Sequence, residues 1–262
     1  DGSLGLQAIK EKNGIVLVQA PSSAKFDAMP RSALDSVNAD IKASVEELPV
    51  KLLNFLKFLP TTNLEPVHKQ ADASSLDKVI ILLREQTGHD FSLYKKNTLL
   101  RRINRRKGVH QIENIKSYIR YLQENPLELE ILFKELLIGV TNFFRDTKVW
   151  NLLMEKILPE LLERVPNGHI LRAWVSACST GEEAYTLAMV FSEAKLKLKT
   201  VKSVTLQIFA TDIDNDAIER ARKGFYPANI SSDVPAEMLS KYFTKENDGY
   251  KLNASVREMV VF

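Results

Sequence analysis

The spacing of apolar and polar residues divides the chain into three blocks. In the first block, residues 14–20 form a short β-branched apolar run typical of a buried strand. Residues 4–12 and 49–59 instead carry apolar side chains at helical spacing. In the later helix the apolar side is expected to consist of Leu52, Leu53, Leu56 and Leu59. This pattern predicts a small α/β segment over residues 1–60.

A polar stretch over residues 61–75 has no clear period and predicts a linker. The second block, residues 76–165, is helical, and Ser75 is in a position to cap its first helix. Glycines and the pair Asn125-Pro126 interrupt the pattern where helices are expected to end. The expected helices cover residues 75–88, 95–107, 112–124, 129–138 and 146–157.

The third block, residues 166–262, changes character. Apolar extended runs at 170–177 and 204–210 alternate with helical patterns at 182–195 and 214–223. This order predicts the opening of a doubly wound, Rossmann-like parallel sheet. Residues 250–252 and 259–262 are expected to be strands of a later element.

The loop after the first strand of this block, residues 176–183, contains candidate binding chemistry. Small residues and a single glycine, Gly181, let a ligand approach the backbone at the start of a helix. Glu182 and Glu183 disfavour a phosphate and favour a cationic or hydroxyl-bearing ligand such as S-adenosylmethionine. A dinucleotide-dependent oxidoreductase is excluded because the three-glycine pattern is missing. An ordinary helix with acidic first-turn residues is the alternative.

Two aspartates follow the second strand of this block. An acidic residue at the carboxyl end of such a strand is suited to hold ribose hydroxyls. Either residue is also able to cap the next helix. We expect Asp212 to bind the ligand and Asp214 to cap.

Arg145 follows Phe143 and Phe144 on a connection between blocks. A buried arginine requires a partner, and a substrate carboxylate would serve as one.

The helix at 95–107 contains seven cationic side chains and no acidic one. Leu99, Leu100 and Ile103 are expected to pack, while the opposite side shows a cationic face to solvent, made of Arg101, Arg102, Arg105 and Arg106. Arginines favour a bidentate phosphate or carboxylate partner. A merely solvated face is the alternative.

Composition narrows these possibilities. A net charge of +3 is too small to indicate nucleic-acid binding by itself, and the single cysteine excludes an internal disulfide. With no apolar run of about 18 residues and no secretion signal, we expect a cytoplasmic protein without membrane insertion. Because the sequence starts at Asp1 and stops within an apolar run, we expect a fragment whose sheet is truncated at its C-terminal end.

Four motifs stand in a fixed order along the chain: VTNFFRD at 140–146, RAW at 172–174, CSTGEEAY at 178–185 and ATDID at 210–214. In order and spacing they resemble the CheR-type chemotaxis receptor methyltransferases. The family pairs a small helical domain with an α/β methyltransferase domain. The resemblance implies S-adenosylmethionine as methyl donor, S-adenosylhomocysteine as product, and glutamates of the receptor's cytoplasmic domain as acceptors.

The resemblance also implies roles for individual residues. It assigns cofactor contacts to Thr141, Arg145, Glu183 and Asp212, and receptor docking to Arg101, Arg102, Arg105 and Arg106. No metal is implied. The chain departs from the family's pattern at Gly139, where many members have asparagine, and at Ala184, where many have proline. The first departure removes one cofactor contact, whereas alanine suits a helix.

The first block has four segments of its own: DGSLGL at 1–6, AIK at 8–10, VQAPSSA at 18–24 and MPRSA at 29–33. They resemble the end of a CheB-type methylesterase domain. Asp1 would match the aspartate of that family's Ser-His-Asp triad, whose other members would lie upstream. Esterase activity is therefore not expected from this chain.

The expected reaction is a direct displacement, because a glutamate carboxylate is already ionised at pH 7 and needs no general base. Arg145 is the candidate to orient that carboxylate. Two alternatives stay open. One is a non-catalytic scaffold that binds S-adenosylmethionine, with the fragment weakly active or inactive. The other is a nucleic-acid methyltransferase, which the modest charge argues against.

Overall fold

The computed structural model describes residues 2–11, 14–36, 39–58, 70–137, 139, 141–198 and 203–262. The chain divides into two compact units, Asp1–Ile138 and Gly139–Phe262. This division differs from the boundary expected near residue 165. The reason is that the helices after residue 146 belong to the second unit, where Trp150 and Leu153 pack against its core.

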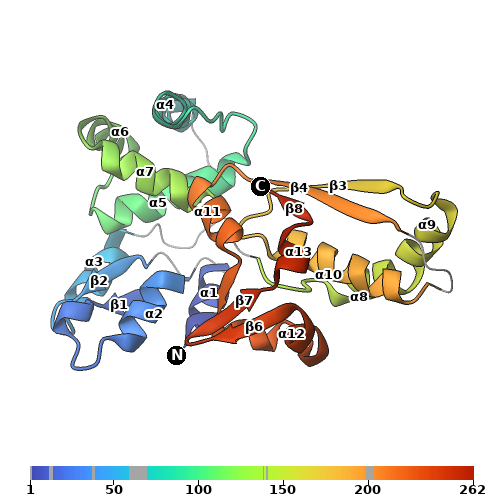
Figure 1. The fold of residues 1–262 in the computed structure, drawn as a ribbon. Helices are drawn as coiled ribbons and strands as arrows, with labels where there is room; N and C mark the ends of the chain where they lie inside the picture. The colour runs from blue at the N-terminus through green and yellow to red at the C-terminus, as the bar shows by residue number, and fades with distance from the viewer. Residues whose placement is uncertain are drawn as a thin grey trace. The chain divides into compact units, whose positions relative to one another are not determined.

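The first unit begins with a small α/β segment (Figure 1). Helices α1 (Ser3–Glu11), α2 (Ala28–Ser36) and α3 (Leu48–Phe58) accompany two short parallel strands, β1 (Leu17–Gln19) and β2 (Ile41–Ala43), and a 3-10 turn at Pro21–Ser23. This confirms the strand expected at 14–20.

The predicted leucine side of α3 is wrong. Phe55 is the buried residue, 2% exposed, whereas Leu53 and Leu56 are 59% and 48% exposed. The side with Phe55 packs onto β2 and onto helix α5 (Lys96–Val109), so those contacts decide which side of α3 is buried. Leu59 lies outside the described residues.

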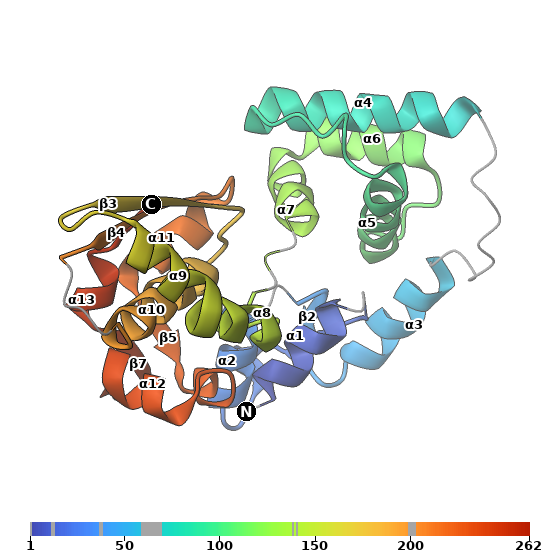
Figure 2. The same cartoon turned by 90° about the vertical axis from the view of Figure 1, so that its right-hand side faces the viewer.

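In the described part of the first unit, four helices follow: α4 (Gln70–Thr87), α5 (Lys96–Val109), α6 (Ile115–Glu124) and α7 (Pro126–Leu136). Helix α4 runs along α6 (Figure 2) and also contacts α7. Their shared core includes Leu76, Leu99, Tyr118 and Leu132. Helix α4 starts before Ser75, which is buried within the helix instead of capping it. The other part of the expected linker, residues 61–69, lies outside the described residues.

The second unit opens with a continuous helical stretch. It consists of α8 (Thr147–Leu152), a π-helical turn (Leu153–Ile157) and α9 (Leu158–Arg164). Strand β3 (Ile170–Ser176), helix α10 (Glu182–Leu196) and strand β4 (Thr205–Thr211) follow, then α11 (Asn215–Lys223). Strands β3, β4 and β8 (Val260–Val261) form a parallel sheet in that order. This confirms the predicted β-loop-α-β opening and the α/β class.

A second, antiparallel sheet lies between α11 and β8 in the sequence. It has the order β5 (Phe225–Pro227), β7 (Gly249–Leu252) and β6 (Phe243–Glu246), with a 3-10 turn (Ala228–Ser232) and α12 (Ala236–Tyr242) between β5 and β6. A short α13 (Ala254–Arg257) leads into β8. The strand expected at 250–252 therefore belongs to this second sheet, and that at 259–262 joins the parallel one.

The parallel sheet buries one face. Ala173 with Ile208 and Val175 with Ala210 are paired neighbours on the side of α10. On the opposite face, Trp174 is 73% exposed and Phe209 is 39% exposed. Within the described residues, no helix is long and apolar enough to cross a membrane.

Candidate functional site

The loop between β3 and α10 has an unusual backbone. Ala177, Ser179 and Gly181 have φ angles of 54°, 48° and 93°. Positive φ costs a residue with a side chain on the order of 1 kcal/mol or more, and such residues cluster at functional sites. Gly181 is the residue that suits this region, because it lacks a Cβ that would lie 3.0 Å from the Cβ of Ala221. The loop is therefore held in one shape at the carboxyl end of β3.

Asp212 joins this loop to the end of β4. Its carboxylate accepts hydrogen bonds from the backbone N–H of Ser179, at 2.7 Å, and of Asp214, at 2.8 Å. Each carboxylate oxygen is able to accept a second hydrogen bond. The hydroxyl groups of a ligand are therefore still able to donate to this half-buried side chain.

Asp214 has the expected capping role. Its side chain accepts from the N–H groups of Asp216, at 3.0 Å, and Ala217, at 3.2 Å, at the start of α11. This part of the prediction is confirmed. The ligand-binding role of Asp212 stays a prediction.

The two glutamates of the loop differ in environment. Glu182 is 9% exposed and accepts a hydrogen bond from the Thr180 hydroxyl. Burial raises the pKa of Glu182 to about 7, although the bond from Thr180 opposes the shift. Glu183, the next residue, is exposed. Of the two, Glu183 is therefore the one exposed to solvent, and its contact with the cofactor stays a prediction.

The segment 139–146 lies beside the same loop. The Ser179 hydroxyl is 3.5 Å from the carbonyl oxygen of Gly139. The N–H of Phe144 donates to the Thr186 hydroxyl on the first turns of α10, at 3.3 Å. Phe143 is buried against Tyr226, with ring centroids 4.8 Å apart. The structure therefore brings the motif of Thr141 and Arg145 to the α10 end where Glu183 lies.

Arg145 itself is exposed and not buried between the phenylalanines. The expectation that it needs a partner because of burial is wrong, since both rings turn into the core and leave Arg145 outside. Thr141 is half-buried. Their assigned contacts with cofactor and substrate stay predictions.

The residues of this edge fit a donor molecule with positive and hydroxyl-bearing groups. Glu183 and Asp212 supply carboxylates, and the strained loop supplies backbone close to them. An anionic phosphate would face repulsion at the same place. The chemistry of the donor set thus agrees with S-adenosylmethionine.

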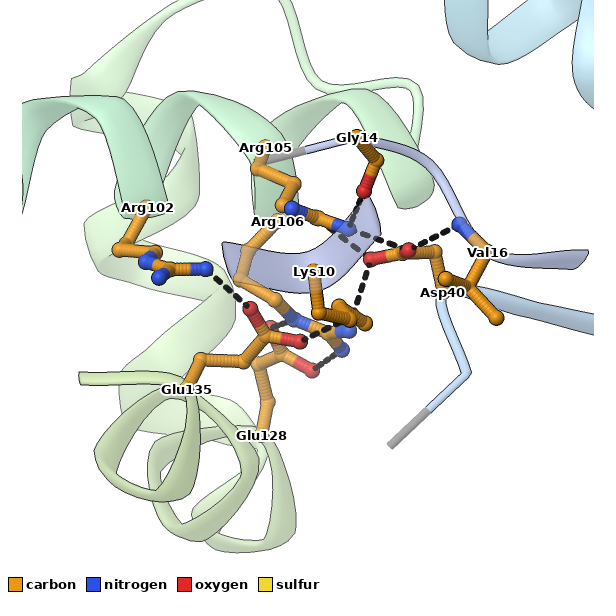
Figure 3. Close-up of polar contacts among 9 residues, drawn as sticks. All are labelled: Lys10, Gly14, Val16, Asp40, Arg102, Arg105, Arg106, Glu128 and Glu135. Atoms are coloured by element: carbon orange, nitrogen blue, oxygen red, sulfur yellow. Dashed lines mark hydrogen bonds and ion pairs between the residues drawn. The ribbon is translucent and has the colours of Figure 1, made fainter. Parts of the chain in front are cut away.

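The arginine face of α5 differs from the prediction, because Arg102, Arg105 and Arg106 point toward carboxylates of the same unit (Figure 3). Arg101 is exposed, but Arg102, Arg105 and Arg106 are each only 6% exposed. The predicted solvent-facing surface is wrong for these three, because carboxylates of the same unit bind them. Glu128 on α7 binds Arg106 through Nε at 2.8 Å and Nη2 at 2.6 Å.

The acidic partners of this face were missed from the sequence. They are Asp40, Glu128 and Glu135, each 7% exposed or less. Charged residues are usually expected at the surface, and these three lie far from α5 in the sequence. The sequence pattern therefore gives little sign that they pair with its arginines. The helical spacing of Glu128 and Glu135, seven residues apart on one side of α7, is the available signal. Asp1 lies outside the described residues.

Three segments of the chain match known protein families. Residues 139–262 match the CheR methyltransferase, SAM binding domain; residues 74–137 match the CheR methyltransferase, all-alpha domain; and residues 1–52 match the CheB methylesterase. The boundary between the two CheR domains coincides with that between the structural units.

Similar individual proteins support the same assignment. The whole chain aligns with 30% of the length of a Rhodobacter capsulatus protein, described as an uncharacterized 104.1 kDa protein in the hypE 3' region, and the aligned residues are 33% identical. Chemotaxis protein methyltransferase 2 of Vibrio cholerae is 30% identical over 68% of the chain and 62% of its own length. The chemotaxis protein methyltransferase of Borreliella burgdorferi is 29% identical over 71% of the chain and 67% of its own. The chain thus spans less than two thirds of the first two relatives.

Proposed function

Since the chain belongs to the CheR methyltransferase family, joined to a segment of the CheB methylesterase type, we propose that it methylates glutamate side chains of a chemotaxis receptor. The methyl donor is S-adenosylmethionine, for which the second unit has the family's binding domain. The observation that carries the proposal is the shared edge of β3 and β4. There Asp212 fixes the strained loop and Glu183 stays exposed at the start of α10.

Each residue has a role in this proposal. Asp212 accepts ribose hydroxyls, while Glu183 and Thr141 line the donor's polar groups. When bound, S-adenosylmethionine supplies a methyl group on a positively charged sulfur. Arg145 orients the acceptor glutamate so that its oxygen points at that methyl carbon. The new bond is C–O, the broken bond is C–S, and the bond's electron pair stays on sulfur, which becomes neutral.

The chemistry requires no base from the protein. A glutamate carboxylate with an ordinary pKa is ionised at neutral pH and is already the nucleophile. Alignment and exclusion of water are the contributions left to the chain. This agrees with a site built from carboxylates, a hydroxyl and an arginine.

The nucleic-acid alternative loses its main argument. It depended on four arginines that grip phosphates, and three of them are buried against carboxylates of the first unit. The other alternative is a scaffold that binds S-adenosylmethionine but transfers no methyl group. A methyl-transfer assay distinguishes it from an enzyme.

The first experiment is calorimetric titration with S-adenosylhomocysteine of three proteins: the wild type, Asp212→Asn and Asp214→Asn. The two variants remove the same charge two residues apart, but asparagine still caps α11 at position 214. We expect saturable binding to the wild type and Asp214→Asn, and a loss of at least roughly tenfold in Asp212→Asn. Equal binding by all three would contradict the proposed site.

A transfer assay then separates enzyme from scaffold. Labelled methyl groups are followed from S-adenosylmethionine to receptor cytoplasmic fragments, with the label's base-lability marking an ester. Donor binding without any labelled ester would favour the scaffold.

A further inference from the structure

Asp40, in the esterase-like segment, is bound to α5 (Figure 3). Both oxygens of Asp40 accept from the Arg105 guanidinium, through Nε and Nη2, and the Gly14 carbonyl accepts from Nη2 at 2.8 Å. Asp40 also accepts from the Val16 N–H, at 2.7 Å, and from Lys10 Nζ, at 3.0 Å. Its side chain is 1% exposed. Asp40 thus occupies the position that a partner's carboxylate would take on Arg105.

Apolar contacts hold the segment at the same place. Ile41, Ala43 and Phe55 form a buried cluster, against which Val109 of α5 packs. Gly108 lies directly under Phe55, whose ring is 3.5 Å from the position of a Cβ at Gly108. The segment therefore covers the C-terminal half of α5, where Arg105 lies, and leaves Arg101 exposed.

Among the residues that the structure describes, the charge cluster around Asp40 is not balanced. Three cations, Lys10, Arg102 and Arg105, share two carboxylates, those of Asp40 and Glu135. Glu135 is 3.7 Å from Lys10 and 3.8 Å from Arg102, beyond hydrogen-bond length. Within the described residues, Arg102 Nε and Glu135 Oε2 are buried without a hydrogen-bond partner. The excess of cations therefore stabilises a carboxylate at this place, whether it belongs to Asp40 or to a partner that replaces it.

We propose that the esterase-like segment is an internal competitor on the arginine face of α5, and that an acidic protein partner reaches Arg105 only by displacing Asp40. The exchange replaces one carboxylate by another, so the guanidinium stays paired in both states. The apparent affinity for the partner equals the intrinsic affinity multiplied by the fraction of molecules in which the segment is displaced, so a small displaced fraction gives weak binding. Release of the segment thus controls docking to the helical domain.

The proposal rests on the proposed function only in taking an acidic receptor-like segment as the partner. The methyl donor is absent from every assay below. Failure of the proposed function would appear as missing donor binding or transfer, whereas failure of this inference would appear in arginine reactivity and peptide binding.

The first test uses the unaltered protein. A dicarbonyl reagent that modifies guanidinium groups is applied under native conditions, and modification is located by mass spectrometry. We expect Arg101 to react at least roughly tenfold faster than Arg105, because Arg105 is covered and doubly hydrogen-bonded. Equal rates would overturn the proposal without any variant having to fold.

The second test removes the competitor's charge. Asp40→Asn keeps the size of the side chain and a carbonyl oxygen for the Val16 N–H, but loses the ion pair. The matched control is Asp27→Asn, in the same segment, whose exposed side chain pairs only locally with Arg31, at 2.6 Å. The probes are a glutamate-rich helical peptide and its glutamine counterpart.

We expect Asp40→Asn to bind the glutamate peptide roughly tenfold more tightly than the wild type does. Asp27→Asn should match the wild type, and the glutamine peptide should show no gain. The gain should vanish in Asp40→Asn combined with Arg105→Gln. An unchanged affinity in Asp40→Asn, or a gain that survives the loss of Arg105, would overturn the proposal.

Discussion

At the scale of single residues, neighbours with the same chemistry have opposite environments. Glu182 is buried and Glu183 is exposed, and Asp214 caps a helix while Asp212 joins two loops. The residue type alone does not distinguish the two members of either pair. The direction of the side chain relative to the core decides which member is able to meet a ligand.

Glu182 predicts a pH dependence of stability. Its folded-state pKa of about 7 lies above its ordinary value of 4.5, because burial favours the protonated form. Its contribution to stability is therefore fully present below about pH 4.5 and is lost as pH rises through about 7. We expect Glu182→Gln to stabilise the second unit by about 2 kcal/mol at pH 8 and little at pH 5. Urea unfolding at both pH values measures this, with the exposed Glu183→Gln as control. A gain of equal size at pH 5 would contradict the assignment.

Arg145 predicts a loss of turnover. Its exposed side chain follows two buried phenylalanines beside the candidate donor site, and we propose that it orients the acceptor carboxylate. We expect Arg145→Ala to lower the rate of labelled methyl transfer by about 100-fold, because misplacement of the nucleophile has costs of that size. Lys148→Ala, an exposed cation three residues later, should have little effect. Full turnover by Arg145→Ala would remove it from the mechanism.

At the scale of elements, the ends of helices and strands shape the site. Gly181, with φ of 93°, directly precedes α10, and the capping Asp214 directly precedes α11. Both helix starts follow the carboxyl ends of parallel strands, so their loops meet at one edge. This is why two motifs about thirty residues apart form a single candidate site.

The cap of α11 gives a prediction for that element. Asp214 satisfies two N–H groups that a helix leaves without internal acceptors. We expect Asp214→Ala to destabilise the second unit by about 1 kcal/mol, and Asp214→Asn to leave it nearly unchanged. Denaturant unfolding gives both values. If alanine and asparagine are equally harmful, charge and not capping is the important property.

At the scale of the whole chain, segments of two families form one packed unit. The first unit combines the CheB-type residues 1–52 with the CheR-type helices from residue 74. Phe55 and the buried ion pairs of Asp40 and Glu135 connect them. In this structure the segment therefore packs as part of the first unit.

Replacement of Phe55 tests how much this packing contributes to the stability of the first unit. We expect Phe55→Ala to destabilise the first unit by about 3 kcal/mol, because it leaves a cavity between α3 and α5. Leu53→Ala, on the exposed side of the same helix, should cost less than about 0.5 kcal/mol. Urea midpoints of both variants test the difference, and a small effect at Phe55 would mean that the segment is loosely held.

The sequence by itself determined the order of elements and the motifs of the second unit. Apolar periodicity and strand–loop–helix spacing are local properties, so the parallel β3–α10–β4 unit and the cap at Asp214 were predictable. Only the tertiary structure decided which side of α3 is buried, that Glu182 points inward, and that Arg102, Arg105 and Arg106 are covered. Those outcomes depend on residues far apart in the chain, such as Asp40 and Arg105, whose pairing leaves no periodic signal. A helix pattern shows which side chains share a face, but the partner packed against that face decides whether it meets water.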